Sequence, residues 1–212
     1  MKPTDILGNI KLYNADCMEV MKTFKDKQFS LAIVDPPYGL KNRLVNGGGG
    51  RNGKYDQNKD SVKWDILPTQ KYFEELFRIS ENQIIWGGNY FSLPPTRCNL
   101  IWYKMQSFSG ADFELAWTSF DKASKSFNMS RIEAYSDGKI HPTQKPVQLY
   151  KWLLQNYAKE GDTILDTHFG SLSIGIACYD LKFDLTAIEL DKDYYEQAKQ
   201  RLINHQRQLT LF

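Results

Sequence analysis

The feature that most constrains the fold is a strand, turn, helix and strand pattern near the carboxyl end of the chain. In order, it comprises an apolar strand at 163–166, a turn at 167–171, a helix beginning at 173–179, and a second strand at 184–188. Glu189 closes the second strand, 19 residues after Gly170 of the turn. In Rossmann-type units a carboxylate at about this distance binds a ribose. The pattern therefore predicts a Rossmann-like α/β fold.

Apolar periodicity predicts further elements along the chain. Strands are expected at 10–13, 31–34, 83–86, 100–103 and 113–118, and helices at 17–23, at 70–79, from the 141–146 block to about 159, and from 191 to about 205. The polar stretches 104–110 and 119–140 are expected to be irregular. A chain of 212 residues is most simply one domain.

Asp35-Pro36-Pro37-Tyr38 follows the buried-type strand Leu31-Ala32-Ile33-Val34. In open α/β sheets, ligands bind in the crevice outside the carboxyl ends of the strands. The two prolines restrict φ and remove two backbone donors, so the turn is stiff. It holds a carboxylate, free carbonyls and an aromatic ring at one place, which suits a flat molecule that carries an amino group. The alternative is a proline turn with an incidental tyrosine.

This tetrapeptide resembles the catalytic motif of the amino-group DNA methyltransferases, which methylate the exocyclic nitrogen of adenine or cytosine with S-adenosylmethionine. Since the motif precedes the glycine-rich loop, the chain resembles the permuted class often called beta. The resemblance implies a Rossmann-like S-adenosylmethionine-dependent methyltransferase fold, with a mixed sheet and helices on both faces, in a single domain over residues 1–212. It implies S-adenosylmethionine as the cofactor and no metal. A restriction-modification or a phage setting is compatible with it.

The resemblance also implies a cofactor site. The block from His141 to Pro146 resembles the segment placed against the methionine part, Asp166–Ser173 the glycine-rich loop, and Glu189 the ribose-binding acid. Asp16 matches an acid beside the adenine, although it reads equally as a helix N-cap. The expected cofactor-binding residues are Asp16, His141, Thr143, Lys145, Asp166, Phe169, Gly170, Ser171 and Glu189.

One residue departs from the family pattern. Leu172 stands where the loop of these enzymes usually has its second glycine. Because glycine there permits a positive φ or a close approach to the ligand, leucine costs strain or space and reduced cofactor affinity is expected. The motif at Asp35 is intact, which favours an active enzyme. A DNA-binding relic that has lost catalysis is the alternative.

By resemblance, the catalytic residues are Asp35, Pro36, Pro37 and Tyr38. Asp35 and the Pro36 carbonyl would accept hydrogen bonds from the target amino group, and Tyr38 would stack on the base, which must be flipped out of the duplex. An aspartate in the first position favours adenine N6, and serine would favour cytosine N4. The three cysteines, Cys17, Cys98 and Cys178, lack the neighbouring proline expected for C5-cytosine methylation.

Two polar, basic stretches are candidates for target recognition, at about 39–63 and 104–140. The first contains four consecutive glycines, and either a DNA-contacting loop or a flexible surface loop fits it. In the second, Phe108, Phe127 and Tyr135 stack on bases or anchor loops. Double-stranded DNA is the expected partner, with contacts from Lys41, Arg43, Arg51, Lys54 and Arg131. Because the recognition region is short, a short or relaxed site is expected, or help from a second subunit in a homodimer.

Composition narrows the remaining possibilities. The net charge of +2 does not by itself indicate nucleic acid, and the cysteines show no CxxC pair that would indicate zinc. With no signal-peptide pattern and no long apolar run, the expected location is cytoplasmic and nucleoid-associated, with no membrane contact.

The last five residues, Gln208-Leu209-Thr210-Leu211-Phe212, resemble the short peptide with which many bacterial replication and repair proteins bind the sliding clamp. A glutamine followed by an apolar wedge at a free chain end suits such docking. The alternative is a terminal segment that packs on its own domain.

Overall fold

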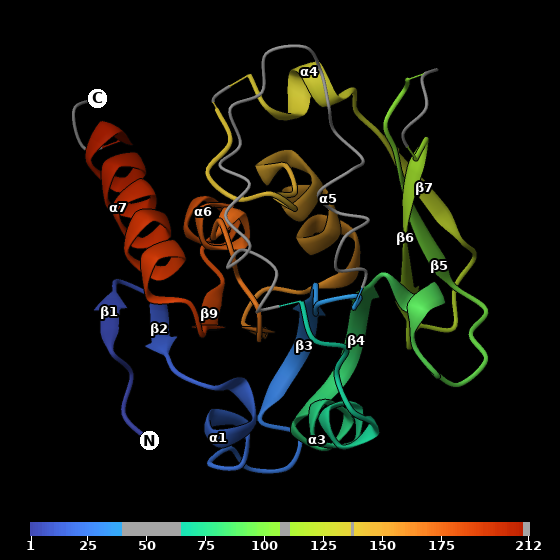
Figure 1. The fold of residues 1–212 in the computed structure, drawn as a ribbon, viewed down its shortest axis with the longest axis horizontal. Helices are drawn as coiled ribbons and strands as arrows, with labels where there is room; N and C mark the ends of the chain where they lie inside the picture. The colour runs from blue at the N-terminus through green and yellow to red at the C-terminus, as the bar shows by residue number, and fades with distance from the viewer. Residues whose placement is uncertain (40–64, 107–110, 137, 210–212) are drawn as a thin grey trace.

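In the computed structural model, residues 1–39, 65–106, 111–136 and 138–209 are described, and they contain a nine-stranded sheet (Figure 1). The strands are β1 Asp5–Leu7, β2 Ile10–Asn14, β3 Phe29–Val34, β4 Ser80–Trp86, β5 Asn99–Tyr103, β6 Phe113–Thr118, β7 Lys125–Asn128, β8 Thr163–Asp166 and β9 Asp184–Glu189. Their order across the sheet is β1-β2-β9-β8-β3-β4-β6-β5-β7.

The sheet is mixed. Strands β2, β9, β8, β3 and β4 run parallel, whereas β6 is antiparallel to β4 and to β5, and β1 is antiparallel to β2. From β3 the chain continues outward to β4, while from β8 it continues in the other direction to β9. The strand order therefore reverses between β3 and β8, and ligand crevices form at such a point.

Helices cover both faces of the sheet (Figure 1). Side chains of β3 alternate between two cores. Leu31 and Ile33 pack with α5 (Val147–Tyr157), α6 (Ser173–Leu181) and α7 (Lys192–Leu209), and Ala32 and Val34 pack with α1 (Cys17–Met21) and α3 (Gln70–Ile79). This confirms the predicted α/β class. The helices are α1 Cys17–Met21, α3 Gln70–Ile79, α4 Arg131–Ala134, α5 Val147–Tyr157, α6 Ser173–Leu181 and α7 Lys192–Leu209, with a 3-10 turn, η2, at Gly88–Tyr90.

The stretch 119–140 was predicted to be irregular, and this is wrong in part because it contains β7 and α4. The edge strand β7 keeps a polar sequence since little of it is buried. A capping box between Ser130 and Glu133 starts α4. Phe127 packs on Trp152, with ring centroids 5.7 Å apart, and the Tyr135 hydroxyl donates to the Gln144 carbonyl at 2.9 Å.

The side chains of Phe127 and Tyr135 thus anchor the polypeptide, whereas Phe108 lies outside the described residues. The helix expected from the 141–146 block begins only at Val147, after Pro146, and the block itself is an extended segment and turn.

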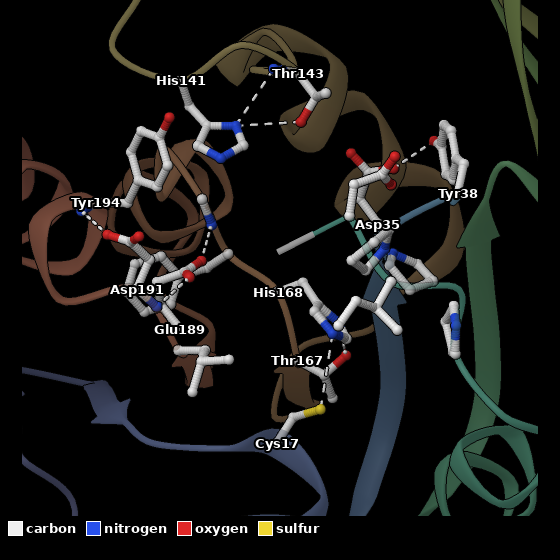
Figure 2. Close-up of a pocket in the computed structure, with 18 of the residues that line it drawn as sticks. Cys17, Asp35, Tyr38, His141, Thr143, Thr167, His168, Glu189, Asp191 and Tyr194 are labelled. Atoms are coloured by element: carbon white, nitrogen blue, oxygen red, sulfur yellow. Dashed lines mark hydrogen bonds between the residues drawn. The ribbon is translucent and has the colours of Figure 1, made fainter. Parts of the chain in front are cut away.

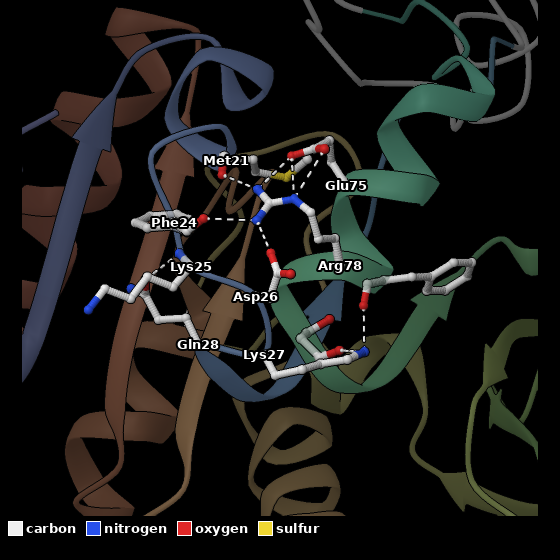
Figure 3. A network of polar contacts seen from close by, with 10 residues as sticks. Met21, Phe24, Lys25, Asp26, Lys27, Gln28, Glu75 and Arg78 are labelled. Atoms are coloured by element: carbon white, nitrogen blue, oxygen red, sulfur yellow. Dashed lines mark hydrogen bonds and ion pairs between the residues drawn. The ribbon is translucent and has the colours of Figure 1, made fainter.

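At the amino end of β3, Arg78 at the end of α3 holds the segment that leads from α1 into the strand (Figure 3). Its guanidinium donates to the Met21 and Phe24 carbonyls at 3.2 and 3.0 Å. It also pairs with Glu75 at 2.8 Å and Asp26 at 2.7 Å. This network fixes α1 and β3 relative to α3.

None of the described helices combines the length and apolar character that a membrane span requires.

Candidate active site

A cavity of about 410 Å³ opens at the carboxyl ends of β2, β3, β8 and β9 (Figure 2). It lies at the crevice where the strand order reverses, and its size falls within the range of small-molecule sites. The predicted site residues in its wall are Asp16, Asp35, Pro36, Pro37, Tyr38, His141, Thr143, Lys145, Phe169, Gly170, Ser171 and Glu189. The fold therefore brings the two predicted motifs to one cavity.

Glu189 ends β9 at one side of the cavity, and its carboxylate is fixed by backbone donors. The Gly170 N–H donates to Oε2 at 3.0 Å and the Asp191 N–H to Oε1 at 2.9 Å. Burial raises the pKa of Glu189. Each oxygen keeps a second lone pair, so the carboxylate can still accept from a pair of ligand hydroxyls.

Gly170 allows His141 to approach the glycine-rich loop. Gly170 has φ +49°, and a Cβ there would lie 3.2 Å from His141 Nδ1. The His141 ring meets Tyr194 edge-to-face at 4.4 Å, and its Nδ1 lies 3.2 Å from Thr143 Oγ1 (Figure 2). Burial, with Lys139 and Lys145 nearby, lowers the pKa of His141 to about 4. His141 is therefore neutral at pH 7.

Asp16 is the N-cap of α1, as one interpretation of the sequence predicted. Its Oδ1 accepts from the Met18 and Glu19 N–H groups at 2.8 and 3.2 Å. It remains exposed and lines the cavity as well. Capping and ligand contact are thus compatible in this side chain.

Asp166 differs from the other predicted residues because it is buried behind the loop, with an exposed fraction of 1%. Its Oδ1 accepts from the His168 N–H at 3.0 Å. Burial raises the pKa of Asp166 to about 8. It therefore shapes the turn that presents residues 167–171 to the cavity.

The floor of the cavity contains a chain of polar contacts that the sequence did not indicate (Figure 2). His168 Nε2 lies 3.7 Å from Cys17 Sγ, and its Nδ1 lies 2.9 Å from Thr167 Oγ1, which is 2.7 Å from the Tyr72 hydroxyl. Burial lowers the pKa of His168 to about 4 and raises that of Cys17 to about 12. Both groups are neutral at pH 7, so they act here as hydrogen-bonding and packing groups.

Leu172 adopts the positive φ expected of the glycine it replaces, at 54°. Its side chain is wholly buried in the core, where a Cβ on Gly175 would lie 2.6 Å from Leu172 Cγ. The part of this loop that faces the cavity is residues 167–171. Leucine thus costs backbone strain, as predicted, but the space that it takes is in the core next to Gly175.

Asp35 lies at the opposite side of the cavity, directly after β3, and both of its oxygens have partners. The Tyr38 hydroxyl donates to Oδ1 at 2.5 Å, and Lys145 Nζ pairs with Oδ2. Tyr38 stacks on Tyr90, with centroids 4.8 Å apart. Gly87 makes room for this ring, because a Cβ there would lie 2.2 Å from Tyr38 Cε1.

Lys145 belongs to a chain of four charged groups. Its Nζ also lies 3.3 Å from Glu114 Oε2, and Lys104 Nζ lies 2.8 Å from Glu114 Oε1. Burial opposes the Lys145 charge, but Asp35 and Glu114 outweigh it and raise the pKa of Lys145. No sequence signal linked Glu114 or Lys104 to the site, since the hairpin of β5 and β6 is distant in sequence from Asp35 and Lys145.

The predicted DNA-binding residues fall mostly beyond what the structure describes. Lys41, Arg43, Arg51 and Lys54 lie outside the described residues, as does most of the 39–63 stretch. Arg131 is the first residue of α4, half-buried, with its guanidinium 6.0 Å from the Tyr135 ring. Of the tail, Gln208 is exposed at the end of α7, and residues 210–212 lie outside the described part. Within the described ranges, no group of three or more His, Cys, Asp or Glu side chains is placed to hold a metal ion.

Comparisons with known proteins show the family to which the chain belongs. Residues 80–200, more than half of the chain, match the N6/N4 methyltransferase family model, described as DNA methylase. The type II methyltransferase M.HpaI of Haemophilus parainfluenzae is 24% identical over 247 residues, covering 91% of this chain and 74% of that protein. M2.LlaDCHI of Lactococcus lactis subsp. cremoris is 24% identical over 251 residues, covering 95% and 92%.

The solved structures that share the fold include two DNA methyltransferases. The complex of M1.HpyAVI with SAM has a TM-score of 0.61 and 18% identity, with coverage of 91% of this chain and 99% of that one. The PvuII DNA methyltransferase, described as cytosine-N4-specific, has a TM-score of 0.63 and 14% identity, with coverage of 96% and 93%.

Proposed function

Since the chain belongs to the N6/N4 DNA methylase family, we propose that it transfers a methyl group from S-adenosylmethionine to the N6 amine of adenine in double-stranded DNA. One observation supports this most directly. The cavity joins the turn of Asp35 to the loop of Gly170 and Glu189, so a bound base and a bound cofactor would meet inside it. Much of the rate of such a transfer comes from positioning the two reactants.

The residues of the cavity fit S-adenosylmethionine. The Glu189 carboxylate is oriented by two backbone N–H groups and suits the ribose hydroxyls, while Phe169 and the half-buried ring of His141 offer apolar surface. When bound, S-adenosylmethionine supplies an electrophilic methyl group on a sulfonium. Asp16, Thr143 and Ser171 complete the proposed cofactor set in the wall, with Asp166 behind it. Lys145, which the resemblance also implied for this set, pairs with Asp35 in the structure.

At the other side, Asp35 and the Pro36 carbonyl would accept hydrogen bonds from the two N–H groups of the target amine. This draws the nitrogen toward tetrahedral geometry and frees its lone pair for attack. The Tyr38 hydroxyl now occupies Asp35 Oδ1, so the incoming amine competes with it for that oxygen. The base must leave the duplex to arrive there, which costs a few kcal/mol.

Cytosine N4 is the second candidate target. The PvuII enzyme, whose fold this chain shares at a TM-score of 0.63, is cytosine-N4-specific. The preference for adenine rests on the aspartate at position 35, which resembles the adenine-type motif.

The test is methylation of unmodified genomic DNA, followed by digestion to nucleosides and mass spectrometry. We expect N6-methyladenine, and its loss in Asp35→Ala. N4-methylcytosine alone would establish the second candidate. Calorimetric titration with S-adenosylmethionine separates an enzyme from a DNA-binding relic, because the relic would not bind the cofactor.

Three further proposals concern partners. Basic residues of the two candidate recognition stretches, including Arg131, would contact the DNA backbone. The tail from Gln208 to Phe212 would bind the bacterial sliding clamp, and unchanged clamp affinity after its deletion would contradict this. A homodimer would compensate for the short recognition region. Sedimentation velocity of the protein with and without DNA measures its oligomeric state.

A further inference from the structure

The Asp35 carboxylate is held by a cation that the proposed reaction has not used. Lys145 approaches from the turn that precedes α5, and 1% of its side chain is exposed. Its Nζ pairs with Asp35 Oδ2 and with Glu114 Oε2 at 3.3 Å, and it lies 5.1 Å from the centroid of the wholly buried Trp86 ring. An ammonium in such surroundings has few other positions to adopt.

The chain of charges continues into the hairpin of β5 and β6. Lys104 lies directly after β5, and its Nζ pairs with Oε1 of Glu114 at 2.8 Å. The backbone N–H of Lys104 donates to the Asp112 carbonyl at 2.8 Å. Positive and negative groups alternate along Lys104, Glu114, Lys145 and Asp35. Each member is thereby paired, which buried charges require.

We propose that Lys145 is a positioning residue for methyl transfer, which fixes the Asp35 carboxylate through Oδ2 so that Oδ1 faces the target amine, and that Glu114 holds Lys145 in place. This rests on the proposed function, because it assumes that Asp35 receives the amine. The proposal assigns Lys145 to the nucleobase side of the cavity. The resemblance of the His141–Pro146 block to the family segment had instead implied that Lys145 contacts the cofactor.

The geometry supports the placement of Lys145 on the side of the cavity where the target nucleobase would bind. Both carboxylate partners of Lys145 belong to the part of the sheet from β3 toward β6, whereas the cofactor loop follows β8. With Oδ2 occupied by Lys145, rotation of the carboxylate would break the ion pair. Asp35 therefore has one oxygen whose partner, the Tyr38 hydroxyl, a ligand can exchange.

The experiment measures the single-turnover rate of methyl transfer at saturating S-adenosylmethionine and DNA, with the cofactor Kd measured separately by calorimetry. Lys145→Met should slow transfer about 100-fold with little change in the cofactor Kd, since misplacement of a reacting group costs about this much. Glu114→Gln should slow it about tenfold, and Lys104→Met less, because each is further from Asp35.

Lys199→Met is the matched control, since Lys199 also pairs with two carboxylates, Asp5 at 3.1 Å and Glu196 at 2.9 Å, away from the cavity. It should leave the rate unchanged. A weaker cofactor Kd in Lys145→Met with a normal saturated rate would overturn the proposal, as would an equal loss in Lys199→Met.

A second measurement does not depend on activity. In a double-mutant cycle of unfolding, Lys145→Met and Asp35→Asn should be strongly non-additive, because each removes the same pair. Additive effects would overturn the proposal even if the wild type methylates DNA. Absence of methyl transfer by the wild type, with non-additivity intact, would instead count against the proposed function. If Lys145→Met does not fold, the rate of methyl transfer by Glu114→Gln tests the proposal instead. An unchanged rate in that variant would overturn it.

Discussion

Two cations of this chain each bind two carboxylates, one at each end of β3, and their surroundings differ. Arg78, at the amino end, is 30% exposed, and its partner Asp26 is 76% exposed. Lys145, at the carboxyl end, is almost wholly buried beside Asp35. Arg78 also satisfies two backbone carbonyls, whereas Lys145 faces side chains and an indole ring.

The difference is in how far water reaches the two networks. Water screens the Arg78 pairs, so their loss is mild. The Lys145 side chain is only 1% exposed, so removing a partner carboxylate leaves its charge with little compensation from water. The buried carboxyl of Asp166 and the strained backbone of Leu172 also lie at the carboxyl ends of the strands. Both features lower the stability of the folded state, and both lie next to the cavity.

The largest expected effect on stability is at Lys145. Lys145→Met should lower the free energy of unfolding by about 3–5 kcal/mol, because it leaves Asp35 and Glu114 facing each other without the cation. Urea denaturation of the purified variant measures this. If Lys145→Met lowered the free energy of unfolding by less than Arg78→Met does, the proposed difference between the two ends of β3 would be wrong.

The next effect is a pH dependence specific to the cavity end. Since burial raises the pKa of Asp166 to about 8 from 3.8, the folded protein keeps a proton that the unfolded chain releases. Stability from this group is full below pH 3.8 and declines until the pH passes about 8. Asp166→Asn carries no such proton and should gain about 3 kcal/mol relative to the wild type between about pH 5 and pH 7.

Denaturation of both proteins at several pH values measures this gain. The lowered pKa values of His141 and His168 give the opposite slope, with stability lost as pH falls from 6.5 toward about 4. That slope is common to both proteins and cancels in the difference. A constant difference across the pH range would show that Asp166 is ionised in the folded state.

A smaller effect tests how the chain accommodates Leu172. Gly175→Ala should destabilise the protein by about 1–2 kcal/mol, because the new Cβ would lie 2.6 Å from Leu172 Cγ. In a Leu172→Gly background the same change should be neutral or stabilising, since alanine favours the helix. Thermal denaturation of the four proteins gives the coupling. Cofactor titration of Leu172→Gly should match the wild type, and a large gain in affinity would mean that Leu172 impairs the cavity.

The smallest effect is expected at Arg78. Arg78→Met should cost about 1 kcal/mol, because its ion pairs are screened and water can reach part of the exposed network. The saturated rate of methyl transfer should not change. A loss of rate in the folded variant would show that the amino end of β3 also positions Asp35, and the two regions would no longer differ in kind.

The sequence by itself determined the α/β class and the residues of both motifs, because these depend on local patterns. Apolar periodicity placed α3, β6 and β8 at their observed bounds, and the prolines after β3 identified the turn of Asp35. The edge strand β7 was missed because its exposure leaves a polar sequence without an apolar alternation.

Only the tertiary structure decided what surrounds those motifs. It placed the Leu172 side chain in the core against Gly175, and it paired Lys145 with Asp35 and Glu114. It also assembled Cys17, Thr167 and His168 into the cavity floor. These contacts join segments far apart in the chain, and the direction of a side chain depends on backbone dihedral angles and packing that no local spacing encodes.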